Sequence, residues 1–121
     1  VLTANFKPVL ACDPNTTVGM EGCGEHRALA ADKQLNADMK VIFGLLDDNT
    51  SKRDFITAQT KWAAYRNADC QSQSDVYEGG TEQPVLFIDC VAGEDILRRQ
   101  DLKGFFELLT QGGAGKGTTF P

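Results

Sequence analysis

Two charged residues lie where helical patterning predicts apolar side chains, and they are the clearest candidates for chemistry in the sequence. At about 100° per residue, one face of a predicted helix carries Phe55, Gln59, Trp62, Ala63, Arg66 and Cys70. Asp32 occupies the same kind of position in an earlier stripe, among Ala28, Leu35, Asn36, Met39, Ile42, Phe43 and Leu46. An unpaired charge at such a position is costly, so each residue needs a partner or a ligand.

The pattern favours a structural pairing of these two charges over a catalytic role. Consecutive helices joined by a short turn pack antiparallel, which brings Asp32 level with Arg66. We predict a bidentate contact between them, with Asn36 and Gln59 close enough to help and the helix register fixed as a result. The functional alternative is a pocket lined by the two charges, in which Trp62 or Tyr65 stacks on a ligand.

Other residues that could act as acid, base or nucleophile do not form a recognisable arrangement. The chain has a single histidine, His26, and no spacing typical of a nucleophile with its base. Five further acids show neither the geometry of a glycosidase pair nor the spacing of an EF-hand, and we expect them to lie at solvated helix ends. They are Asp47, Asp48, Glu94, Asp95 and Asp101. The segment GAGKG lacks the full phosphate-loop spacing. We therefore predict no enzyme, no cofactor and no metal site.

The four cysteines indicate disulfides rather than zinc. Cys12, Cys23, Cys70 and Cys90 are even in number and contain no Cys-x-x-Cys spacing. With one histidine in the chain, a structural zinc site would need all four thiolates, whereas two disulfides are typical of a small exported domain. The cysteines thus favour a periplasmic or secreted protein.

Hydrophobic periodicity predicts an all-α fold, a small bundle of about three main helices. The expected helices run from Thr16 to Asp48, from a cap at Thr50 or Ser51 to about Ser72, and from a cap at Thr81 through Pro84 to Leu109. We expect residues 1–110 to form one domain and the glycine-rich residues 111–121 to form a flexible tail.

Composition limits the partners of this domain. The chain has 121 residues, 41% hydrophobic and 24% charged, with a net charge of -5. No apolar run is long enough for a membrane span, and the scattered basic residues argue against nucleic acid. A basic partner is compatible with the acidic balance.

Several spaced motifs resemble one family of bacterial exported proteins. In order they are Cys23, ADKQLN, AQTKWAAYRNADC, YEGGT and Cys90, and the likeness extends from about Cys12 to Leu109. The sequence is similar to the LprI-type lysozyme inhibitor domain. This resemblance implies a small helical domain, export, disulfides joining Cys12 to Cys23 and Cys70 to Cys90, and inhibition of lysozyme or another cell-wall hydrolase.

The segment from Gln71 to Pro84 is the best candidate for the inhibitory surface. Cysteines at 70 and 90 would staple the base of this expected loop, which presents Asp75, Tyr77, Glu78 and Thr81. A purely structural reading remains open, in which Gly79 and Gly80 only allow the turn and Thr81 only caps a helix. The alternative function is an envelope binding or scaffold module with a peptide, glycan or protein partner in a groove around Trp62 and Tyr65.

Overall fold

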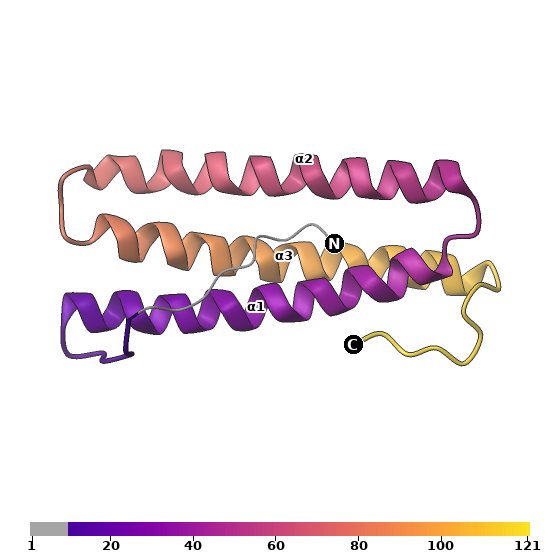
Figure 1. Cartoon of the computed structure of the whole chain (residues 1–121), viewed down its shortest axis with the longest axis horizontal. Coiled ribbons are helices and arrows are strands. Elements are labelled where there is room, and N and C mark those ends of the chain that lie inside the picture. The colour runs from indigo at the N-terminus through magenta and orange to yellow at the C-terminus, as the bar shows by residue number, and fades with distance from the viewer. Residues whose placement is uncertain (1–9) are drawn as a thin grey trace.

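The computed structural model describes residues 10–121, which form three long helices. Helix α1 spans Thr17–Leu45, α2 spans Asn49–Ser74 and α3 spans Gln83–Gln111, and the short 3-10 helix η1 (Asp75–Tyr77) lies between the last two. The helices run side by side along one long axis (Figure 1). The predicted all-α class with three main helices is confirmed.

The starts of α1 and α2 follow from side-chain caps. Thr16 Oγ1 accepts a hydrogen bond from the backbone amide of Gly19 at 2.9 Å. Asp48 Oδ1 accepts one from the amide of Ser51 at 2.7 Å, so the predicted cap at Thr50 or Ser51 is wrong by two or three residues. These hydrogen bonds from Ser51 lower the pKa of Asp48 from its ordinary value, because they favour the ionised carboxylate.

The start of α3 also differs from the prediction. Its N-cap residue is Glu82, which makes no side-chain capping bond, so Thr81 does not cap this helix. Pro84 lies in the first turn, where backbone amides have no intrahelical partner. Because α2 continues through Ser74, the connection to α3 is shorter than the loop predicted for residues 71–84.

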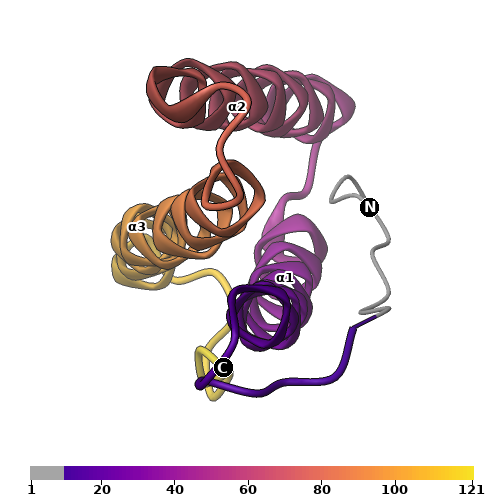
Figure 2. The same cartoon turned by 90° about the vertical axis from the view of Figure 1, so that its left-hand side faces the viewer.

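Helix α3 is the central element of the bundle. It packs against both α1 and α2, whereas α1 and α2 make few contacts with each other. The view along the bundle shows the same arrangement, with α3 beside each of the other helices (Figure 2). Side chains of α3 can therefore meet those of both partners at one level.

The core has two apolar parts separated by charged residues. The larger part contains Leu35, Met39, Ile42, Leu46, Phe55, Leu102 and Phe106. The smaller part contains Ala28, Cys70, Val91 and Ala92. Three buried charged residues lie between these parts along the helices: Asp32, Arg66 and Asp95. We call these three residues the charge layer.

Both predicted disulfides are confirmed, Cys12 with Cys23 and Cys70 with Cys90. The first holds the segment before α1 against that helix at Gly22. A Cβ at Gly22 would lie 2.1 Å from the carbonyl oxygen of Ala11, so only glycine allows this approach.

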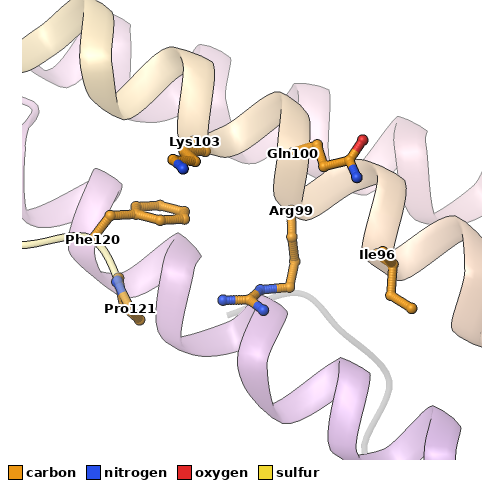
Figure 3. A pocket seen from close by; sticks show the side chains of 6 residues that line it. All are labelled: Ile96, Arg99, Gln100, Lys103, Phe120 and Pro121. Atoms are coloured by element: carbon orange, nitrogen blue, oxygen red, sulfur yellow. The ribbon is translucent and has the colours of Figure 1, made fainter.

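The residues after α3 turn back onto the bundle. Phe120 packs against Phe106 with ring centroids 5.2 Å apart. Figure 3 shows Phe120 and Pro121 beside Lys103 and Arg99, around a cavity of about 400 Å³. The flexibility expected for residues 111–121 stays a prediction.

Candidate functional site

The charge layer joins all three helices through one guanidinium. Arg66 Nη1 donates to Asp95 Oδ1 at 2.8 Å and to Asp32 Oδ1 at 3.3 Å. The expected pairing of Asp32 with Arg66 is therefore present, but both carboxylates share Nη1, so the bidentate geometry predicted for Asp32 is wrong. Arg66 Nε donates instead to Asn67 Oδ1 at 3.1 Å.

Asp95 is the member of this layer that the sequence did not reveal. We expected a solvated acid, and its side chain is instead fully buried. The helical spacing could have predicted this burial, because Asp95 lies three residues after Ala92 and seven before Leu102, on the apolar face of α3.

The charge layer favours the protonated form of Asp95. Burial, a hydrogen bond with Asp32 that favours protonated Asp95, and the nearby charge of Asp32 raise the pKa of Asp95 to about 8, against the opposing effect of Arg66. One cation therefore faces two carboxyl groups of which one is protonated at neutral pH. This arrangement neutralises buried groups and holds the register of three helices, which is a structural task.

The residues expected around the charge layer have other contacts. Gln59 is fully buried and its Oε1 accepts a hydrogen bond from Arg98 Nε at 3.0 Å, while Asn36 is half-buried. The Trp62 ring lies 5.3 Å from the Arg66 guanidinium and 5.8 Å from that of Arg98. Tyr65 points to solvent.

A small cavity of about 140 Å³ borders the charge layer. Asp32 and Arg66 line it together with Ala28, Asn67, Phe87, Ile88 and Val91. Neither Trp62 nor Tyr65 is among these residues, so this cavity is not the ligand slot expected from the sequence. Its volume is below the usual range of about 300–1,000 Å³ for small-molecule sites.

A further, partly buried ion pair joins α1 to α3. Arg99 donates from Nε to Asp38 Oδ2 at 2.6 Å and from Nη2 to Asp38 Oδ1 at 3.1 Å. Asp38 is fully buried, and the hydrogen bonds with it raise the pKa of Arg99. Figure 3 shows the Arg99 guanidinium directed toward α1. This bidentate pair was not predicted, because neither residue interrupts an apolar stripe as plainly as Arg66.

The connection between α2 and α3 forms the exposed tip of a disulfide-closed hairpin. We call residues 75–82 the acidic tip, since they include Asp75, Glu78 and Glu82. The disulfide between Cys70 and Cys90 closes the base of this hairpin, with the two Cα atoms 5.4 Å apart. Figure 1 shows the tip at one end of the bundle, beyond the last turn of α2.

Asp75 braces the acidic tip. Its Oδ1 accepts from Gln71 Nε2 at 2.6 Å and from Gln83 Nε2 at 3.1 Å, so one carboxylate links the end of α2 to the start of α3. Gly79 has a positive φ of 80°, which favours glycine at this turn. The tip is thus preorganised by its own side chains, and Asp75 is already engaged in holding it.

The outer surface of the tip combines apolar and acidic groups. Val76 is 78% exposed and Tyr77 is 51% exposed, and they stand beside the exposed Glu78 and Thr81. Val76 was not among the contact residues expected from the sequence. An apolar residue in a polar segment, between Asp75 and Tyr77, could have indicated it. Exposed side chains of this kind on a braced turn are suited to protein contact.

Metal binding has little support. Among residues 10–121, one set of three potential ligands lies close together: Asp69, Cys90 and Glu94. The Cys90 sulfur is already bonded to Cys70, so no thiolate is offered. A hydrogen bond with Asp69 raises the pKa of Glu94, because it favours the protonated form of that carboxyl group.

Taken together, the fold and the tip define a small helical domain stapled by two disulfides, with a braced acidic turn at one end. The family described as lysozyme inhibitor LprI matches residues 11–102. The chain belongs to this family. No curated protein and no solved structure matches it. None of the helices in the described part of the chain is long and apolar enough to cross a bilayer.

Proposed function

We propose that this protein inhibits lysozyme or another cell-wall hydrolase by placing the acidic tip in or over the substrate cleft. Membership in the LprI family supports the inhibitory role. The observation that carries the proposal is a turn with exposed Val76 and Tyr77 that is braced by Asp75 and closed by a disulfide. A rigid projecting element loses little conformational entropy when it binds, which favours affinity.

Charge distribution supports a basic target. Between Asn67 and Leu97 there is no lysine, arginine or histidine, and the acids are Asp69, Asp75, Glu78, Glu82, Asp89, Glu94 and Asp95. Of these, Asp89 pairs with Arg27 and Asp95 is buried, while the tip keeps three exposed carboxylates, those of Asp75, Glu78 and Glu82. A negative tip accelerates encounter with a basic enzyme and sets its orientation.

Tyr77 would be the central anchor of the complex. An aromatic ring supplies a large contact area with few rotatable bonds, and a phenol hydroxyl can donate to a carboxylate in a glycosidase cleft. Glu78 and Thr81 would lie around this ring as polar contacts, and Asp75 would keep the turn in shape. Inhibition by occupation needs no catalysis by this chain, and it requires the protein in the periplasm or outside the cell.

The test is the rate at which a basic c-type lysozyme lyses bacterial cell walls as purified, oxidised protein is added. We expect saturable inhibition at physiological salt, and a loss of at least about tenfold in potency for Tyr77→Ala, since aromatic hot spots commonly contribute 2 kcal/mol or more. Tyr65→Ala is the matched control, because Tyr65 is similarly exposed but lies on α2 away from the tip.

Three results would contradict this assignment. Absence of inhibition at both low and physiological salt would remove the proposed activity. Inhibition confined to low salt would indicate non-specific charge attraction rather than a complex at the tip. Inhibition lost with Tyr65→Ala and retained with Tyr77→Ala would move the contact surface to the α2 face near Trp62, where the binding-module alternative places it.

A further inference from the structure

A third pocket lies at the end of the bundle opposite the acidic tip. Its volume is about 410 Å³, within the usual range for small-molecule sites. The apolar walls come from the residue that follows α1, from the first half of α2 and from the second half of α3: Leu46, Phe55, Ala58, Phe105 and Leu109. Its remaining lining residues are Ser51, Asp54 and Arg98. The pocket is thus an apolar groove with few polar groups.

Arg98 lacks a carboxylate partner in this groove. Among residues 10–121, no acidic side chain lies within ion-pair distance of it, in contrast to Arg99 on the same helix, which pairs with Asp38. Arg98 Nε bonds the neutral amide of Gln59, and its guanidinium lies 5.8 Å from the Trp62 ring.

Burial has a larger effect on the pKa of Arg98 than the neighbouring acids have. Desolvation lowers its pKa from the ordinary value, and the charge of Asp101 opposes this shift only in part. Asp54 on the lining is exposed to solvent. The groove therefore holds a partly buried guanidinium, that of Arg98, for which the described residues supply no carboxylate within ion-pair distance.

We propose that this groove binds a linear medium-chain fatty acid, with its carboxylate on Arg98 and its hydrocarbon chain along Phe55 and Phe105. A single anionic head would give Arg98 the carboxylate partner that it lacks, and a plain hydrocarbon chain would match the apolar side chains that make up most of the lining. A glycan or an extended peptide fits less well, because its many polar groups would lose water without finding new hydrogen bonds. This site is separate from the tip and does not depend on the proposed inhibition.

The test measures binding of sodium decanoate to the full chain by calorimetry and by the emission of Trp62, the only tryptophan. We expect saturable one-to-one binding well below the micellar concentration, and a change in Trp62 emission because its ring contacts Arg98. The alcohol 1-decanol, which has the same chain without the charge, should bind at least about tenfold more weakly, since hydrogen bonds to charged groups are the stronger ones.

Three variants separate the site from general hydrophobic adsorption. Arg98→Gln should weaken decanoate binding at least about tenfold, whereas Lys103→Gln, which makes the same change in net charge outside the groove, should leave it unchanged. Ala58→Phe fills the groove from an exposed helix position and should abolish binding without touching Arg98. It keeps the test valid if Arg98→Gln fails to fold. Equal binding of decanol, or full binding by folded Ala58→Phe, would overturn the proposal.

Discussion

The charge layer and the acidic tip use the same residue type in opposite ways. In the layer, Asp32 and Asp95 are buried around one guanidinium, and the pKa of Asp95 is raised to about 8. At the tip, Asp75 is exposed and is held by the side-chain amides of Gln71 and Gln83. The first arrangement aligns helices where no partner can reach, and the second shapes a surface that water and proteins can reach. We therefore expect the layer to serve stability and the tip to serve the proposed recognition.

This separation has an energetic basis. Removing one partner from a buried charge cluster leaves uncompensated charge in the core, which is strongly destabilising. An exposed side chain loses little when truncated, since its surroundings in the folded and unfolded states are similar. Substitutions in the layer should therefore change the free energy of unfolding, while substitutions at the tip should change inhibition alone.

Arg66→Met should have the largest effect on stability. It leaves Asp32 and Asp95 buried without a cation, and we expect a loss of about 3–5 kcal/mol in the free energy of unfolding. Urea denaturation followed by circular dichroism measures this loss. The triple variant Asp32→Leu, Arg66→Met, Asp95→Leu removes all buried charge and should recover wild-type stability. An unchanged midpoint for Arg66→Met alone would refute the structural role.

The disulfide at the base of the tip connects the two regions, so its removal should affect both. Cys70 and Cys90 are 20 residues apart, and a loop of that length is expected to contribute about 3 kcal/mol by restricting the unfolded chain. We expect Cys70→Ser with Cys90→Ser to lose about that much stability and to inhibit lysozyme less per folded molecule. The pair Cys12→Ser with Cys23→Ser is the control, because it should lower stability without reducing inhibition by the folded fraction. Equal inhibition by both double variants would show that closing the hairpin is unimportant.

The charge layer should also make stability depend on pH. The folded-state pKa of Asp95, about 8, lies above the value of about 3.9 for an unfolded chain, so the folded state binds the extra proton between these values. Stability from this group is therefore greatest at low pH and is lost as pH rises toward 8, by up to about 1.4 kcal/mol per unit. Glu94, whose pKa is also raised, adds to the same trend.

Thermal unfolding of the wild type and of Asp95→Asn between pH 5 and 8 checks this expectation. The wild type should lose stability across the interval, and Asp95→Asn should have a clearly smaller slope, since its amide does not titrate. Parallel curves for the two proteins would assign the pH dependence to other groups.

The sequence predicted the layer better than the tip, for a physical reason. A charge inside an apolar stripe needs compensation, so Asp32 and Arg66 could be identified from spacing alone. Asp95 was missed because it follows Glu94 in a segment that resembles a solvated acidic surface. The three helices and both disulfide pairings were predicted correctly.

Details of caps and turns depend on local geometry that composition does not specify. Thr81 is a good capping residue by type, yet α3 starts after Glu82 without any side-chain cap. Likewise, the bracing role of Asp75 depends on two glutamines, one from each helix, that meet only after the hairpin closes. The types of these residues allow such hydrogen bonds, but the sequence does not show that the residues come together.

Of the substitutions discussed, Val76→Ser should change stability least. It therefore tests most directly whether the acidic tip, unlike the charge layer, is free of a role in the fold. Val76 is 78% exposed, so we expect a change within about 0.5 kcal/mol in the free energy of unfolding. If the tip enters a cleft, this side chain is desolvated in the complex, and inhibition should weaken several-fold. Ile56→Ser on α2, also exposed but remote from the tip, should leave inhibition unchanged. A large loss of stability with Val76→Ser would mean that the tip, like the charge layer, serves the fold and that the inhibitory contact lies on another surface.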